Sequence, residues 1–225
     1  MFVRGIKMDC IETIKQRKSI RAFTNKVPDK ALILECLDAA SWAPNPTSQQ
    51  PWQFIVLTGN SLNRVSRTIK ESFPASPIQN TGPAAKKPEA VQKLELRKKK
   101  NFTEMISFLK ESGADMSLLA QGNFNFHGAP LAVLFATWPC KDQNYVKSVL
   151  SAMQNFMLAA AAKGLGTCWA NAVSICQKSI KKELDLPEDM ILVDGISVGY
   201  PDPEAAVNRV PRHRRPIDEV TLWFV

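Results

Sequence analysis

Near the N-terminus, the stretch Arg17-Lys18-Ser19-Ile20-Arg21 gathers three cations and a hydroxyl within five residues. A guanidinium group can bond two phosphate oxygens at once, an ammonium adds a point charge, and a serine hydroxyl is a small donor. This set suits a phosphate monoester. The alternative is a solvated basic turn, so other segments must decide between the two interpretations.

The segment 43–52, APNPTSQQPW, is a second stretch of interest. Its three prolines exclude a helix or a central strand. We expect a stiff loop whose amides and hydroxyls can converge on a planar polar ligand. A plain connector between a helix and a strand is the alternative.

Other catalytic patterns are missing from the sequence. The two histidines, His127 and His213, are isolated, and the five cysteines show no C-x-x-C spacing, so no metal site is indicated. The pair Gly164 and Gly166 lies where a helix leads into a strand, the reverse of the dinucleotide-binding order. If the protein is an enzyme, its reactive group therefore comes from a cofactor.

The alternation of helices and strands indicates a mixed α and β class. Apolar periodicity and end signals predict helices over about 9–18, 29–42, 61–72, 88–112, 145–163 and 174–186. They predict strands over about 53–58, 129–138, 166–173, 190–198 and 220–225. The helix over 145–163 is apolar almost all round, which requires cover within the domain or from a second subunit.

The chain length of 225 residues fits one domain, 1–225, with an excursion from the core at about 73–126. The excursion holds a basic helix whose cations are most simply a solvated face. Its aromatic end, Phe124 to His127, is either a lid over a site or, more commonly for such residues, a buried packing cluster.

The formal net charge of +8 is compatible with nucleic-acid binding, but the sequence has no helix-turn-helix, zinc finger or RNP pattern. An anionic cofactor or substrate explains part of the charge more economically, and we expect no nucleic-acid partner. The apolar runs fall short of the roughly 20 residues of a membrane span, and no signal-peptide pattern is present. We expect a cytoplasmic protein with no membrane partner.

Four motifs in order resemble the nitroreductase family of flavin enzymes: RKSIRAF, APNPTSQQPWQF, GLGTCW after an alanine-rich helix, and R-x-R near the C-terminus. The ordered set covers most of the chain apart from the excursion. The resemblance implies an α+β fold with a central mixed β-sheet flanked by helices. It also implies an intertwined homodimer, with flavin mononucleotide (FMN) at the interface and a C-terminal segment that crosses to the partner.

The resemblance also implies roles for individual residues. Those expected to hold the phosphate and ribityl chain of FMN are Arg17, Lys18, Ser19, Arg21, Arg212 and Arg214. Those expected to lie along the flavin ring or its reactive edge are Asn45, Pro46, Ser48, Leu165 and Gly166. Ser48 stands where the family commonly has Asn, and Asn45 where Ser is frequent.

The activity implied by the resemblance is transfer of hydride from NADH or NADPH, through FMN, to a small-molecule acceptor such as a nitroaromatic or a quinone. The alternative within the family is a specialised reaction, either flavin fragmentation or reductive dehalogenation. The alternative from another class is a basic nucleic-acid-binding module. No catalytic acid or base is identified from the sequence.

Overall fold

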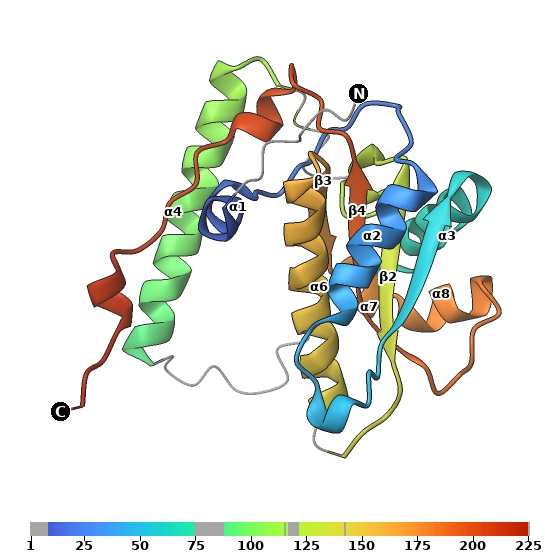
Figure 1. Ribbon diagram of the computed structural model, residues 1–225. Helices are drawn as coiled ribbons and strands as arrows, with labels where there is room; N and C mark the ends of the chain where they lie inside the picture. The colour runs from blue at the N-terminus through green and yellow to red at the C-terminus, as the bar shows by residue number, and fades with distance from the viewer. Residues whose placement is uncertain (1–8, 75–87, 115, 117–121, 142, 225) are drawn as a thin grey trace, which may run out of the picture.

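The computed structural model describes residues 9–74, 88–114, 116, 122–141 and 143–224. Its centre is a four-stranded antiparallel sheet of order β1-β2-β4-β3 (Figure 1). The strands are β1 (Gln53–Thr58), β2 (Leu131–Thr137), β3 (Gly166–Ala170) and β4 (Ile191–Gly199). Ser19 adds a parallel bridge to Thr167 at the β3 edge. The sheet is thus antiparallel with one parallel contact, at the segment that carries the N-terminal cations.

Helices cover both faces of the sheet. One face packs against α2 (Lys30–Ser41) and α6 (Asn144–Ala162), and the other against α3 (Gly59–Ser72), α7 (Ala172–Ile175) and α8 (Gln177–Glu183). Strand β2 is buried along its whole length, and alternate side chains enter the two cores. Val133 and Phe135 face α6, while Ala132 and Leu134 face α3.

Helix α6 buries one side against the core and contacts α1 (Cys10–Gln16) on another. Its buried residues pack against α2 and the sheet, so part of its apolar surface is covered within the domain. On the side toward α1, Leu158, Ala159 and Ala162 line an open groove of about 640 Å³ together with residues of α1. Among the described residues, this part of the apolar helix is therefore only partly covered.

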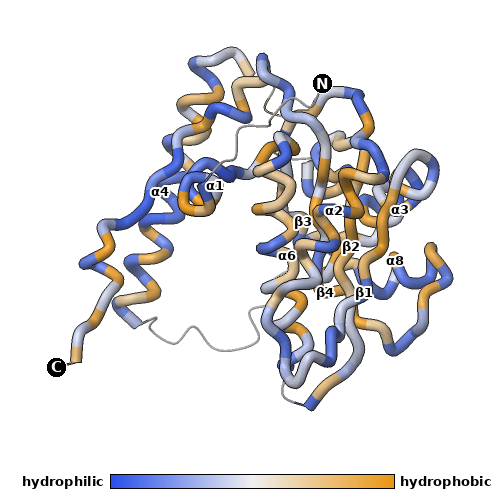
Figure 2. Tube along the Cα trace, viewed as in Figure 1, coloured by the Kyte–Doolittle hydropathy of each residue, from blue (hydrophilic) through white to orange (hydrophobic). Residues whose placement is uncertain are grey.

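Helix α4 (Glu89–Glu111) stands apart from the layers, and the C-terminal segment runs alongside it (Figures 1 and 2). Arg97 of α4 forms an ion pair of 3.8 Å with Glu219. The strand predicted over 220–225 is wrong for the described residues. A 3₁₀ helix, η4 (Ile217–Val220), precedes unpaired backbone over 221–224, because the segment lies beside a helix and not beside a sheet edge.

The other predicted elements are confirmed to within about two residues at each end, with two exceptions. The helix predicted over 174–186, with Ser174 as its cap, is shorter at both ends and is observed as α8 (Gln177–Glu183). The strand predicted over 166–173 ends at Ala170, and the chain turns into α7. A helix of four residues is too short to show helical periodicity, so the sequence does not distinguish it from the end of a strand. Ser174 therefore caps no helix, and its hydroxyl donates to the Asp194 carboxylate at 2.7 Å.

The aromatic end of the excursion forms a packing cluster. Phe126 is fully buried in the core beside α3, and Phe73 and Phe124 meet edge to face with ring centroids 5.0 Å apart. In the described part of the chain, no helix has the length and apolar character needed to cross a bilayer.

Candidate functional site

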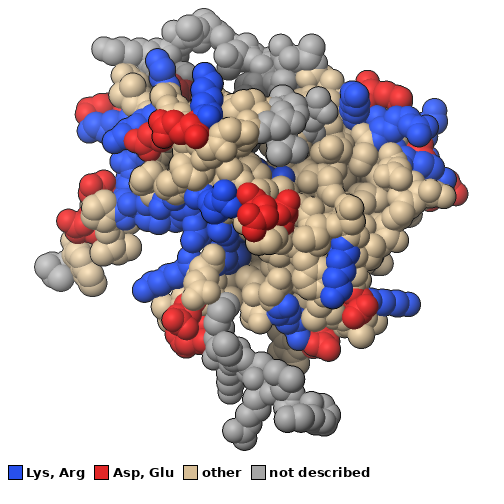
Figure 3. All heavy atoms as spheres, turned by 90° about the horizontal axis from the view of Figure 1, so that it is seen from above, with Lys and Arg blue, Asp and Glu red and all other residues tan. Residues whose placement is uncertain are grey.

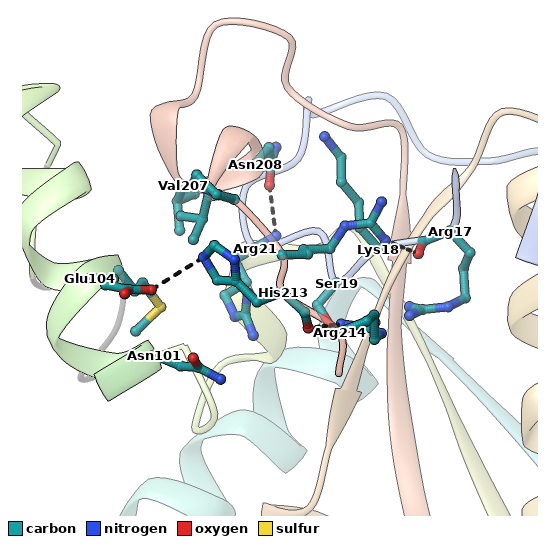
Figure 4. Close-up of a pocket in the computed structure, with 14 residues that line it drawn as sticks. Arg17, Lys18, Ser19, Arg21, Asn101, Glu104, Val207, Asn208, His213 and Arg214 are labelled. Atoms are coloured by element: carbon teal, nitrogen blue, oxygen red, sulfur yellow. Dashed lines mark hydrogen bonds and ion pairs between the residues drawn. The ribbon is translucent and has the colours of Figure 1, made fainter. Parts of the chain in front are cut away.

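The two basic segments predicted to bind phosphate lie together. Their side chains line one pocket of about 310 Å³, which we call the basic pocket (Figure 4). The predicted residues that line it are Arg17, Lys18, Ser19, Arg21, Arg212 and Arg214. Its remaining wall includes Asn101, Glu104 and Met105 of α4. Segments about 190 positions apart in sequence thus share one concave site.

The N-terminal cations are positioned by a helix end and a sheet edge. Helix α1 begins at an Asp9 carboxylate that accepts from the Ile11 N–H, and the Arg17 N–H donates to the Thr13 carbonyl at the other end. The Ile20 N–H then donates to the Thr167 carbonyl of β3 at 2.9 Å. Backbone bonds on both sides therefore hold the basic stretch in place.

Gly166 permits the close approach of this stretch to β3. A Cβ atom at position 166 would lie 2.7 Å from Cγ1 and 2.9 Å from Cβ of Ile20, distances that real atoms do not adopt. Ile20 is buried and branched at Cβ, so it has little freedom to move aside. Packing against Ile20 therefore requires glycine at position 166, independently of any ligand.

Asn208 joins the two segments and was not identified from the sequence. Its buried amide oxygen accepts from the N–H groups of Arg21 (2.8 Å) and Ala22 (3.3 Å). Its amide nitrogen donates to the carbonyls of Ala22 (2.8 Å) and Asp202 (3.0 Å). One side chain therefore fixes the basic stretch against the segment that leads to Arg212 and Arg214 (Figure 4).

The basic pocket concentrates like charges. Burial lowers the pKa of the Arg17 guanidinium, and the charges of Arg212 and Arg214 lower it further. Arg212 is held by the carbonyls of Arg17 and of Lys15, the latter at 3.1 Å. No acidic side chain among the described residues forms an ion pair with these three arginines. The arrangement is suited to a bound anion.

The residues predicted to lie along the flavin ring fall into two groups. Leu165 and Gly166 line a hollow of about 210 Å³ whose wall also includes Arg17 and Lys18, so they adjoin the basic pocket. Asn45, Pro46 and Ser48 belong to the loop around η1 (Pro46–Ser48), near the opposite end of α6 (Figure 1). The 19 residues of α6 span about 28 Å.

Hydrogen bonds of Asn45 brace the loop around η1, which the sequence predicts to be stiff. The Asn45 amide oxygen accepts from the Gln50 N–H at 2.8 Å, and its amide nitrogen donates to the Ala43 carbonyl at 3.1 Å. Thr47, Ser48 and Gln50 all have positive φ angles. Ser48 is exposed. Within one chain, this loop and the basic pocket do not meet.

A sequence model described as the nitroreductase family matches residues 14–200, which is more than half of the chain. The chain belongs to the nitroreductase family. It is 27% identical over 222 residues to a chloronitrobenzene nitroreductase of Comamonas testosteroni, with 94% of this chain and 95% of that relative covered. It is 30% identical over 211 residues to a 4-nitrobenzoate reductase of Pseudomonas putida, with 88% and 89% covered.

Solved structures agree with this family. A variant of the FMN and NADPH-dependent nitroreductase NfnB from sphigopyxis sp. strain HMH gives a TM-score of 0.80 at 26% identity, with 96% of this chain and 99% of that chain covered. The FMN-dependent nitroreductase NfnB from Mycobacterium smegmatis, in complex with NADPH, shares the fold with a TM-score of 0.78 at 23% identity, over 95% of this chain and 96% of that chain.

Two buried groups, Cys168 and His127, lie within the electrostatic influence of Arg21, a residue of the basic pocket. Burial raises the pKa of the Cys168 thiol, while Arg21, a hydrogen bond with Ser19 and Arg17 oppose the change. Burial and then the nearby Arg21 lower the pKa of His127 to about 4. His127 is therefore neutral near pH 7. The described residues contain no group of three or more His, Cys, Asp or Glu placed to hold a metal ion.

We predict that Asn208→Ala destabilises this nitroreductase-family protein by about 3 kcal/mol, because buried polar groups of the basic stretch lose their partner. The FMN affinity should fall as well, since the basic stretch is released from the C-terminal segment. Urea unfolding and flavin titration measure the two effects. The matched control is Asn63→Ala on the exposed side of α3, which should change stability by less than about 0.5 kcal/mol. Unchanged FMN affinity in Asn208→Ala would contradict the positioning role.

The depressed pKa of His127 predicts a loss of stability in mild acid. Its pKa of about 4 lies below the ordinary 6.5, so between these values the unfolded chain binds the proton more readily. The contribution of the neutral imidazole to the free energy of unfolding is fully present above pH 6.5 and is lost as pH falls towards 4. Between pH 7 and 5, the free energy of unfolding of the wild type should fall by about 2 kcal/mol more than that of His127→Asn. Asparagine suits this comparison because it tolerates the positive φ at position 127. Urea unfolding of both proteins at pH 7 and pH 5 measures this difference. An equal loss of stability in the wild type and the variant would refute the burial of a neutral imidazole.

Proposed function

We propose that this protein is an FMN-dependent oxidoreductase that transfers reducing equivalents from NADH or NADPH to nitroaromatic, quinone or related small-molecule acceptors. The observation that carries the proposal is the set Arg17, Arg212 and Arg214 around an open pocket. None of the three forms an ion pair with an acidic residue in the part of the chain that the structure describes. The donor is supported by the NADPH-dependent NfnB, and the acceptor class by relatives named for chloronitrobenzene and 4-nitrobenzoate.

The donor chemistry of the basic pocket fits the phosphate of FMN. Arg17 and Arg214 would each bond phosphate oxygens, Lys18 would add charge, and the Ser19 hydroxyl would donate. Burial and then the charges of Arg212 and Arg214 lower the pKa of Arg17, and a bound phosphate would oppose this by favouring the charged guanidinium. When bound, FMN supplies two-electron exchange with the nicotinamide and with the acceptor. The chain's own contribution is to bind, orient and shield the cofactor.

The ring of FMN requires residues from both ends of α6. Leu165 and Gly166 adjoin the basic pocket in the same chain, whereas Asn45, Pro46 and Ser48 lie near the other end of a helix about 28 Å long. FMN is too short to bridge that length. We therefore propose a homodimer in which the loop around η1 of a second copy completes each site.

The C-terminal segment supports the same assembly. Leu222, Trp223 and Phe224 are 82%, 84% and 92% exposed. Three consecutive large apolar side chains are seldom left in water, and contiguous exposed patches of this kind mark interfaces. The partly covered side of α6 provides further apolar surface. A reducing compartment fits the five free cysteines, so we also propose a cytoplasmic location, to be decided by cell fractionation.

We predict that the purified wild type binds FMN with the absorption of oxidised flavin and that NADH or NADPH bleaches it. Arg17→Ala and Arg214→Ala should each weaken FMN binding about ten- to a hundredfold, because one charge-assisted contact is lost. Flavin content after purification and fluorescence titration measure this.

The control is Lys98→Gln with Lys99→Gln, two exposed cations of α4 outside the basic pocket, for which flavin content should not change. Full retention of FMN in both arginine variants would show that the phosphate lies elsewhere. A colourless wild type that takes up no added FMN would refute the proposed function.

We predict that removal of residues 221–225 shifts the protein from dimer to monomer. Burial of the three apolar side chains is worth roughly 5 kcal/mol, so the dissociation constant should rise at least about a thousandfold. Analytical ultracentrifugation measures the change, and FMN should be lost in parallel. Trp223→Phe with Phe224→Leu keeps the segment apolar and should remain dimeric. An unchanged sedimentation coefficient after truncation would exclude this segment from the interface.

A further inference from the structure

A second hollow adjoins the basic pocket between α4 and the C-terminal segment. It measures about 680 Å³, and we call it the cationic groove. Lys93, Arg97, Lys100 and Arg215 line the groove but not the basic pocket. Glu104 and Arg214 are among the residues that line both, so the two hollows adjoin each other. Figure 3 shows Lys and Arg gathered in a band on this side of the molecule.

The cations of α4 in the groove lie on one face of that helix. Lys93, Arg97 and Lys100 are four and three residues apart, the spacing of neighbours on a helix surface. Lys98 and Lys99 lie at other angles and do not line the groove. The basic half of α4 is therefore divided into a face that turns toward the C-terminal segment and a face that only meets solvent.

The charge of the groove is only partly neutralised. Lys93 pairs with Glu89 at 2.7 Å, Arg97 with Glu219 at 3.8 Å, and Lys100 with Glu104 at 3.9 Å. Such exposed pairs contribute little and exchange readily for a stronger anion. Arg214 and Arg215 have no acidic partner among the described residues. The five cations thus face three carboxylates, and the excess is positive.

We propose that the cationic groove binds the 2′-phosphate of NADPH and makes NADPH the preferred donor over NADH. This inference rests on the proposed function. The nicotinamide must reach the flavin, whose phosphate we place in the basic pocket, and the adenosine half must then extend over adjoining surface. The cationic groove adjoins that pocket. A 2′-phosphate carries about −1.5 to −2 charges near pH 7, as other phosphate monoesters do.

The kinds of residue in the groove favour a compact phosphate over a nucleic-acid strand. Arg97 and Arg215 offer planar forks that match the oxygens of one phosphate group. Binding of a single strand normally adds aromatic side chains on which bases stack. The described lining of the groove contains no Phe, Tyr or Trp, and the exposed Phe102 of α4 lies outside it.

The test compares the FMN-replete wild type, the double variant Arg97→Gln with Arg215→Gln, and the control Lys98→Gln with Lys99→Gln. Steady-state rates with NADPH and with NADH give kcat/KM for each donor at one fixed nitroaromatic acceptor. The wild type should prefer NADPH. In the double variant the NADPH value should fall about tenfold through KM. The NADH value should fall by about threefold at most, because only exposed pyrophosphate contacts are affected.

Ionic strength provides a second readout. The KM for NADPH in the wild type should rise more steeply with salt than the KM for NADH, and the double variant should lose this difference. The control variant has the same change in net charge as the double variant but lies outside the groove, so its donor preference should match the wild type. Its result separates a local contact from a general effect of charge.

The proposal is overturned if the wild type uses both donors equally, if the double variant lowers both values alike, or if the control loses NADPH preference to the same extent. Salt-sensitive binding of a labelled single-stranded RNA that the double variant abolishes, with donor preference unchanged, would reassign the groove to nucleic acid. A wild type that holds FMN but oxidises neither donor would refute the proposed function, a result distinct from all of these.

Discussion

The repulsion among Arg17, Arg212 and Arg214 is the constraint on which the site depends. Partial burial disfavours the charged form of Arg17, and the like charges of Arg212 and Arg214 add to the cost, as the lowered pKa of Arg17 indicates. The chain withstands this because neutral groups hold the segments in place. The buried Asn208 amide, the Ile20 to Thr167 backbone bond and the carbonyls that accept from Arg212 all act without adding negative charge. The pocket therefore keeps its positive field for a ligand.

The main elements could be predicted from the sequence, as could the basic residues that line the candidate site. Apolar residues located β2 because it is buried along its whole length, and α6 because it is long and buries an apolar stripe. The basic residues near each end of the chain stood out by charge. Helix α7 was missed because four residues are too few to show a period. The terminal strand over 220–225 was predicted from its apolar residues alone, and none of the described strands lies beside this segment.

Asn208 shows why the rest of the site was not accessible from sequence. Asparagine is common, and its partners at Arg21 lie 187 positions away, so no local pattern marks it. The division of α4 into a groove-facing and a solvent-facing side likewise depends on where the C-terminal segment runs. Sequence identifies residues that carry charge, whereas the packing of distant segments decides which of those charges act together.

The same short C-terminal stretch lines the basic pocket with Arg212 and Arg214 and, eight residues further on, exposes Leu222 to Phe224. If the apolar residues dock on a second copy, ordering them also orders the arginines, and cofactor binding and subunit association become thermodynamically linked. The apparent affinity for FMN would then increase with protein concentration. Dilution would release the flavin before any part of the core unfolds, and added flavin would draw the subunits back together.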